Sequence, residues 1–163
     1  MKTKLKMAPL ALALGLMAAA PTFAQSDTTR SGPAQSSTAQ RGLGSLVGVW
    51  RMTSLEVGTP GNLQAVPYSG QIVFTTAGTM SVQALNPDRD APDTPYTVNG
   101  YEAFYGTVSP GGAAGTFVVT VQSSLAHDLV GQRLTRVFDV SGRTLVLTPP
   151  NPAEGWRATY ERL

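Results

Sequence analysis

Apolar and polar side chains alternate with a period of two along most of the chain beyond residue 42. Within 116–123, for example, Phe117, Val119 and Val121 fall in one register, whereas Thr116 and Thr120 fall in the other. This alternation is typical of β-strands with one buried face, and the spacing typical of helices is nearly absent. The pattern predicts strands over residues 46–57, 71–76, 79–85, 101–109, 116–123, 133–140, 143–148 and 156–162.

Short turn signals separate most of these predicted strands. Ala77-Gly78, Ser141-Gly142 and the glycine-rich segment 111–115 are short enough for hairpins, so successive strands should pair antiparallel. A meander of about eight strands with one apolar face must close into a barrel or stack on a second sheet. The short C-terminal connections favour the barrel, because the crossovers of a Greek-key sandwich need longer loops. We therefore predict an all-β fold, a single antiparallel up-and-down β-barrel, with the sandwich as the alternative.

The first 24 residues are typical of a secretory signal peptide. Lys2, Lys4 and Lys6 precede the apolar stretch 7–20, and Thr22-Phe23-Ala24 places small residues where a signal peptidase cuts. This stretch has 14 residues. A helix that spans a membrane needs roughly 20, so an anchor is the weaker interpretation. We expect cleavage after Ala24 and a periplasmic or secreted location.

The next segment, residues 25–42, is rich in Ser, Thr, Gln and Gly. Its apolar side chains are those of Ala34 and Ala39, too few to offset the entropy lost when a chain becomes ordered. We expect a flexible polar linker here and a single folded domain over residues 43–163. A domain of that length can bury one hydrophobic core without disulfides.

Charge and composition exclude several classes of protein. All three lysines lie in the leader, and beyond it nine arginines stand against ten acidic residues, a net charge of −1. That balance lacks the basic surface that nucleic acids and anionic membranes attract, so we expect no nucleic-acid partner and no stable membrane insertion after leader cleavage. The chain contains no Cys, which excludes disulfides, thiolate nucleophiles and Cys-ligated zinc.

The segment Leu46-Val47-Gly48-Val49-Trp50-Arg51 resembles the start of lipocalin-like (calycin) barrels, which carry Gly-x-Trp on their first strand. The chain is most similar to the bacterial and fungal lipocalin-like domain family. Further similar segments follow in order at residues 70–74, 78–82, 88–89, 101–107, 129–131, 136–138, 145–148 and 160–162. The resemblance implies a calycin-type barrel over residues 43–163. Relatives often carry His on the strand that matches 117–123, but Val119 and Thr120 stand there, so His-dependent chemistry does not carry over.

Two residues at opposite ends of the predicted domain should meet when the barrel closes. In an eight-stranded closure the first and last strands become neighbours, so Arg162 can lie over the ring of Trp50. Trp50, Met52 and Ser54 share one register of the first predicted strand. Calycin barrels close one end with such a pair, and the resemblance therefore assigns Trp50, Arg162 and Gly48 to barrel closure.

Arg136 is the most informative polar residue, because its register places it with Leu134, Phe138 and Val140 on the apolar side of its predicted strand. An unpaired guanidinium there is costly and needs a carboxylate, an aromatic face or water. One hypothesis is that Arg136 projects into a cavity and binds an acidic or carbonyl-bearing ligand. The alternative is an internal ion pair, with Glu102 as the first candidate partner.

The remaining candidates for a pocket are apolar or aromatic side chains. Tyr101, Phe104 and Tyr105 crowd one predicted strand, and Tyr105 is the first choice for a pocket hydroxyl. Such residues also fill the core of a small barrel, so both interpretations stay open. The full set of predicted ligand-binding residues is Arg136, Tyr105, Tyr101, Phe104, Met80 and Phe74.

No arrangement of residues predicts a catalytic or metal site. His127 has no second His as a partner, and the Gly-x-Ser-x-Gly elbow of serine hydrolases is absent from the sequence. Asp88, Asp90 and Asp93 lack the Gly and terminal Glu of a calcium loop. We therefore expect no catalytic residue, no metal and no cofactor.

These observations favour an exported lipocalin-like protein that binds a small apolar or amphipathic molecule in the barrel interior, for transport, storage or sequestration. One alternative is an isomerase- or cyclase-type enzyme, which needs few ionisable groups. A second is a fully packed barrel that acts through its outer surface on an envelope protein.

Overall fold

The computed structural model describes residues 42–163 of the chain. The predicted signal peptide 1–24 and nearly all of the predicted linker 25–42 lie outside the described residues. No helix within 42–163 is long and apolar enough to cross a membrane. The described part begins with one helical turn at 42–44 and continues almost entirely as β-strands, so the all-β prediction is confirmed.

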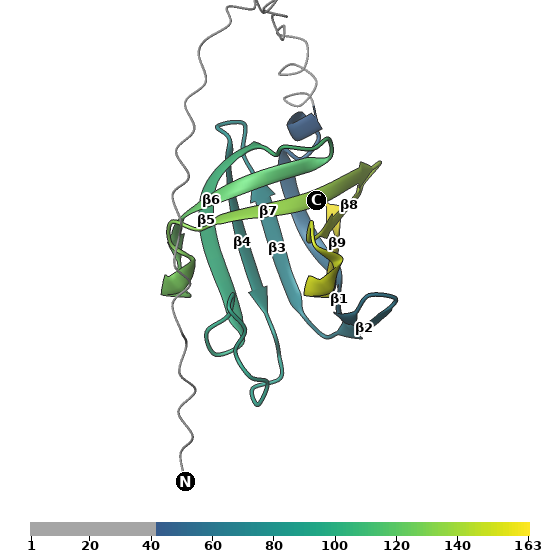
Figure 1. The fold of residues 1–163 in the computed structure, drawn as a ribbon, viewed down its shortest axis with the longest axis vertical. Coiled ribbons are helices and arrows are strands. Elements are labelled where there is room, and N and C mark those ends of the chain that lie inside the picture. The colour runs from purple at the N-terminus through teal and green to yellow at the C-terminus, as the bar shows by residue number, and fades with distance from the viewer. Residues whose placement is uncertain (1–41) are drawn as a thin grey trace, which may run out of the picture. The chain divides into compact units, whose positions relative to one another are not determined.

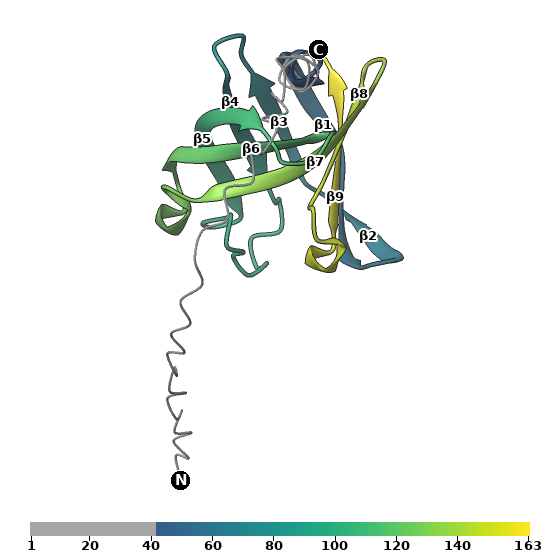
Figure 2. The same ribbon diagram turned by 45° about the horizontal axis from the view of Figure 1, so that its top comes forward.

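Nine strands follow one another along the chain, and Figures 1 and 2 show them wrapping around a common interior. Two 3₁₀ turns, η1 (His127–Leu129) and η2 (Pro152–Glu154), interrupt them. The strands are β1 (Gly48–Thr59), β2 (Asn62–Val66), β3 (Ser69–Phe74), β4 (Thr79–Leu85), β5 (Tyr101–Pro110), β6 (Thr116–Ser124), β7 (Arg133–Ser141), β8 (Thr144–Thr148) and β9 (Trp156–Arg162).

The sheet closes on itself because β1 pairs with β9 as well as with β3. From β3 to β9 each strand pairs antiparallel with the next, so eight strands form an up-and-down barrel. The remaining strand, β2, pairs with the C-terminal end of β1. Leu55 to Thr59 of β1 lie opposite Asn62 to Val66 of β2. The sequence pattern predicted no strand between residues 57 and 71, which is wrong: the chain there makes a hairpin in which β2 pairs with the part of β1 that also pairs with β9.

A β-bulge in β1 corrects the predicted register of that strand. The pairing with β9 shifts between Met52 and Ser54, so one extra residue is inserted there. Ser54 therefore leaves the register of Trp50 and Met52, and Leu55 and Val57 take the inward positions beyond the bulge. This change of register explains why the alternation along 46–57 is less regular than elsewhere.

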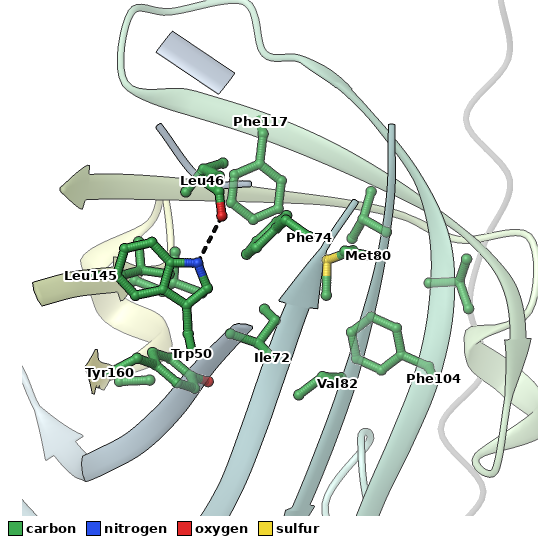
Figure 3. Close-up of a cluster of buried hydrophobic side chains, with 14 of the residues drawn as sticks. Leu46, Trp50, Ile72, Phe74, Met80, Val82, Phe104, Phe117, Leu145 and Tyr160 are labelled. Atoms are coloured by element: carbon green, nitrogen blue, oxygen red, sulfur yellow. Dashed lines mark hydrogen bonds between the residues drawn. The ribbon is translucent and has the colours of Figure 1, made fainter. Parts of the chain in front are cut away.

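One end of the barrel is filled by packed side chains (Figure 3). Trp50 and Leu145 are fully buried there, and the indole Nε1 of Trp50 donates a hydrogen bond of 2.7 Å to the carbonyl of Leu46. The rings of Phe74 and Phe117 pack edge to face with their centroids 5.5 Å apart. The helical turn 42–44 lies at this end, whereas the β1–β2 hairpin, the β4–β5 loop and η2 lie at the opposite end (Figure 1). The packed end leaves the opposite end as the one where a ligand could enter.

Candidate functional site

The interior of the barrel holds a cavity of about 540 Å³. Its wall is made by inward side chains of most barrel strands, which the strand period of two turns to the same side. Figure 3 shows three of them, Met80, Val82 and Phe104, on the inner side of β4 and β5. The apolar wall residues are Met52, Leu55, Ile72, Met80, Val82, Phe104, Phe117, Val119, Leu147 and Ala158. The barrel is therefore hollow beyond its packed end, with a wall suited to an apolar guest.

The β4–β5 loop covers part of the mouth of this cavity and presents Tyr96 to it. The loop is held by its own polar groups: the backbone N–H of Thr94 donates to Oγ1 of Thr97 at 2.7 Å. The backbone N–H of Gly100 donates to Oδ1 of Asp93 at 2.9 Å, and this bond lowers the pKa of the Asp93 carboxyl. The β4–β5 loop is thus held in one conformation over the mouth of the cavity by its own hydrogen bonds.

The turn before β9 forms the other side of the mouth. Asn151 caps η2 by accepting a hydrogen bond from the backbone N–H of Ala153 at 3.1 Å, and Gly155 ends the turn in the left-handed conformation at φ 65°. The carbonyl of Gly155 accepts a hydrogen bond of 2.8 Å from the backbone N–H of Gly58. This bond ties the turn to the β1–β2 hairpin and places Trp156 at the mouth of the cavity.

Arg136 lies between these two covers, with its guanidinium stacked between aromatic rings. Its Cζ is 5.5 Å from the ring centroid of Tyr96 and 5.1 Å from that of Trp156. Its Nη1 also donates a hydrogen bond of 2.9 Å to the carbonyl of Thr135. Two cation–π contacts of this kind stabilise a partly desolvated guanidinium. Arg136 therefore lines the cavity, as its register predicted.

The predicted ion pair between Arg136 and Glu102 is not formed. Among the described residues, no ion pair with atoms within 4.0 Å includes Arg136. Both side chains line the same cavity and interact at longer range. The aromatic faces of Tyr96 and Trp156 take the place of the carboxylate that sequence reasoning assigned to Arg136.

Glu102 is the acidic side chain of the cavity wall, on β5 next to Phe104. Burial disfavours its charged form and raises the pKa of its carboxyl to about 7, although the positive charge of Arg136 acts in the opposite direction. Near neutral pH this carboxyl is therefore present in both protonation states. It can donate a hydrogen bond as the acid or accept one as the carboxylate.

The hydroxyls of two tyrosines line the cavity together with Glu102 and Arg136. Burial raises the pKa of Tyr160 well above its ordinary value, and the charge of Glu102 adds to the shift. Burial also raises the pKa of Tyr68. Both phenols are therefore neutral at physiological pH and can orient a polar group of a guest. The arrangement is an apolar chamber whose polar groups include the Arg136 guanidinium, the Glu102 carboxyl and the hydroxyls of Tyr68 and Tyr160.

Three of the six predicted ligand-binding residues line the cavity: Arg136, Phe104 and Met80. Phe74 is buried in the core beside Phe117, outside the cavity wall.

Tyr101 and Tyr105 are not at the cavity, which corrects their assignment as pocket residues. They lie in the register of β5 opposite to Glu102 and Phe104, so the period of two turns them outward. Tyr105 is 46% exposed, and Tyr101 lines a separate groove outside the barrel. The hydroxyls that sequence reasoning sought on β5 come instead from Tyr68 and Tyr160.

The three residues assigned to barrel closure lie together at the packed end. The Cζ of Arg162 is 4.0 Å from the ring centroid of Trp50. Gly48 has φ +142°, and a Cβ added to it would lie 2.6 Å from Nη1 of Arg162. The absence of a side chain at Gly48 therefore leaves room for the guanidinium beside the Trp50 ring.

Sequence reasoning missed Tyr96, Trp156 and Tyr68 as cavity residues. Trp156 carried a signal, because it begins the predicted strand 156–162 in the same register as Ala158 and Tyr160, which are buried. The sequence gives no signal that Tyr96 faces the cavity, because this residue lies in a proline-rich loop without periodicity.

The residues weighed for catalysis or metal binding lie elsewhere. His127 is in η1, and its side chain is exposed. Asp88 and Asp93 cap their own loop: Oδ1 of Asp88 accepts a hydrogen bond of 3.0 Å from the backbone N–H of Asp90. Within residues 42–163, no group of three His, Cys, Asp or Glu side chains is placed to hold a metal ion.

No protein-family model matches this chain, and no curated protein matches it. Two solved structures that match come from Bacteroides. An uncharacterized protein from Bacteroides eggerthii DSM 20697 is 18% identical with a TM-score of 0.45, over 72% of this chain and 99% of that one. A lipocalin-like protein from Bacteroides uniformis ATCC 8492 is 18% identical with a TM-score of 0.47, over 73% of this chain and 99% of that one. The strand order and closure of the present chain are in themselves those of a lipocalin-like barrel.

Proposed function

We propose that this protein binds a small, mostly apolar molecule inside its barrel and serves to transport, store or sequester it. The observation that carries the proposal is the cavity of about 540 Å³ with its apolar wall. Pockets that enclose small ligands typically measure about 300–1,000 Å³ and combine apolar walls with a few polar groups. A barrel of eight strands is just wide enough for one such guest.

The cavity argues against the alternative of a fully packed barrel. Packed interiors leave few voids larger than a water molecule, and a void of this size would lose the contacts that stabilise a core. A wall that includes Met80, Phe104 and Ala158 gains those contacts when an apolar guest fills the space. The size and apolar wall of the cavity therefore favour a barrel that encloses a ligand.

The proposed place of action is the periplasm or the exterior of the cell, after cleavage behind Ala24. It is supported by the signal-peptide pattern of residues 1–24. The polar segment 25–42 would then tether the barrel or leave it free to diffuse. N-terminal sequencing of the protein secreted by its host tests this part: Gln25 is expected as the first residue, and an intact Met1 contradicts it.

Binding is tested with N-phenyl-1-naphthylamine, a neutral apolar dye whose fluorescence rises in apolar surroundings. Ala158 lines the cavity and Thr159, the next residue of β9, points to the other side of the strand. Ala158→Leu fills part of the cavity, whereas Thr159→Leu places a side chain of the same final size outside it. We expect saturable binding that Ala158→Leu weakens about tenfold and Thr159→Leu leaves unchanged. Absence of binding, or equal effects of both variants, contradicts the proposal.

A second candidate function, an isomerase- or cyclase-type enzyme, is favoured by Glu102. A buried carboxyl with a pKa near 7 has the protonation behaviour of a general acid or base. Native mass spectrometry of protein purified from its host identifies the guest and provides the test. A binding protein releases that molecule unchanged, whereas an enzyme converts it and the Glu102→Gln variant does not.

A further inference from the structure

The guanidinium of Arg136 presents a charge to the barrel interior that no acidic group neutralises at contact distance within the described residues. The Cζ of Arg136 lies over the rings of Tyr96 and Trp156, and one N–H is used by the carbonyl of Thr135. The other N–H donors lie along the edge of the plane. A carboxylate or another oxyanion binds at such an edge, often through two hydrogen bonds. The geometry therefore orients Arg136 for an anionic group within the cavity.

Glu102 sets the conditions under which such an anion can enter. Its carboxyl lines the same cavity and takes part in no hydrogen bond or ion pair among those of the described part. A negatively charged Glu102 would repel a bound anion at low dielectric, whereas the neutral acid would not and could donate a hydrogen bond to it. The charge of Arg136 is therefore unopposed by its acidic neighbour inside the barrel only when Glu102 carries a proton.

We propose that the guest is an amphipathic acid, with its apolar body in the barrel and its anionic group on Arg136, and that its binding is coupled to protonation of Glu102. The inference rests on the proposed ligand-binding function and deepens it by naming the class of ligand. The pKa of Glu102, near 7 without a ligand, supports the coupling, because the carboxyl then changes charge within the physiological range. An anion bound beside Glu102 raises that pKa further.

The other titratable groups around Glu102 keep one charge over this range. Tyr160 on β9 and Tyr68 before β3 both have a pKa raised by burial and stay neutral. Asp93, in the β4–β5 loop, has a lowered pKa and stays charged. Glu154 lies at the rim on η2, exposed to solvent that screens its charge. The coupled proton is therefore assigned to Glu102.

The sign of the pH effect follows from this coupling. Below pH 7 Glu102 is mostly neutral. The anion is then attracted by Arg136 without repulsion from Glu102, and its affinity is highest. As the pH rises above 7, binding must first return a proton to Glu102, so the affinity falls by up to about tenfold for each pH unit. A neutral ligand shows no such dependence.

Two dyes with the same aromatic body test the proposal. 1-Anilinonaphthalene-8-sulfonate is N-phenyl-1-naphthylamine with an added sulfonate, which stays ionised throughout the range. Both are titrated by fluorescence at pH 6.0 and 8.5 into the whole protein and into Arg136→Gln, Glu102→Gln and Arg133→Gln. Arg133 lies on the same strand and is exposed, so its variant is the matched control. Circular dichroism verifies the fold of each variant.

We expect the sulfonated dye to bind about tenfold more tightly at pH 6.0 than at pH 8.5, and the neutral dye to bind equally at both. Arg136→Gln should weaken the sulfonated dye about tenfold more than it weakens the neutral one, while Arg133→Gln changes neither. Glu102→Gln should remove the pH dependence. If the neutral dye binds inside the barrel but the sulfonate shows no preference for Arg136 or for acidic pH, this inference is overturned and the proposed function stands. If neither dye binds, both are overturned.

Discussion

The guanidinium of Arg162 lies over the ring of Trp50, with 4.0 Å between its Cζ and the ring centroid. Its Nη1 and Nη2 donate hydrogen bonds of 2.6 Å each to the carbonyls of Val47 and Ser45. One side chain from β9 thus holds the chain entering β1 and covers the indole at the end of the core. The contact joins the first and last strands of the barrel. Trp50 and Arg162 are paired in the sheet although they lie 112 residues apart in the sequence.

Replacing Arg162 by Lys should destabilise the closed end. A lysine keeps the charge but cannot stack as a plane while donating to two carbonyls. We expect the free energy of unfolding in urea to fall by about 2 kcal/mol. Arg133→Lys, at an exposed position of β7, is the control and should change it by less than about 0.5 kcal/mol. Equal values for the two variants would show that the Arg162 contact does not stabilise the barrel.

Gly48 should not tolerate a side chain. Its φ of +142° is rarely adopted by other residues, and a Cβ would approach Nη1 of Arg162 to 2.6 Å. We expect Gly48→Ala to lower the free energy of unfolding by about 1–3 kcal/mol. Gly44 has open space around its Cβ position, so Gly44→Ala should be neutral or slightly stabilising. A neutral Gly48→Ala variant would contradict the geometry of this end.

The strand pattern of the sequence was enough to predict the barrel, and particular residues show why. The strands at 79–85 and 156–162 match β4 and β9 at both ends, and a short turn signal directly precedes each of them. The strand β2 was missed because only Leu63 and Val66 are partly buried in it, and its pairing depends on the distant end of β1. The bulge after Met52 was equally hidden, since it arises from pairing with β9.

The stability of the protein should fall as the pH rises from about 4.5 to 7. Glu102 ionises with an ordinary pKa of 4.5 when unfolded and about 7 when folded, so the folded state binds the extra proton within this window. Stability therefore decreases through the window and levels off above it, by up to about 3 kcal/mol from this group.

The variant Glu102→Gln isolates this contribution from the other titrating groups. We expect wild type and variant to differ increasingly in their free energy of unfolding between pH 5 and pH 8, with the variant the more stable at pH 8. Urea unfolding at each pH measures the difference. A constant difference across the range would show that folding does not shift the pKa of Glu102.

Adjacent residues on β5 should differ sharply in their effect on binding. Phe104 lines the cavity, whereas Tyr105 is 46% exposed on the outer face. We expect Phe104→Leu to weaken binding of N-phenyl-1-naphthylamine about three- to tenfold through the loss of aromatic contact. Tyr105→Leu should leave the dissociation constant unchanged. An effect at Tyr105 as large as that at Phe104 would place the dye outside the barrel.

The candidate site was less accessible to sequence reasoning than the fold. Register placed Arg136 inside, because its strand alternates regularly, whereas Phe104 was named together with Tyr101 and Tyr105 as one of three crowded aromatics. The partners of Arg136 could not be derived, since Tyr96 reaches it from a loop and Trp156 from the far end of the chain. Such contacts depend on tertiary folding, which no local pattern records.

A crystal structure of the protein with N-phenyl-1-naphthylamine tests the central claim most directly. The claim is that the barrel interior is a chamber for a small guest. The account predicts one dye molecule within the barrel, in contact with Met80, Phe104 and Ala158 and below the covers that carry Tyr96 and Trp156. A barrel whose interior is filled by its own side chains, with the dye absent or on the outer face, would contradict it.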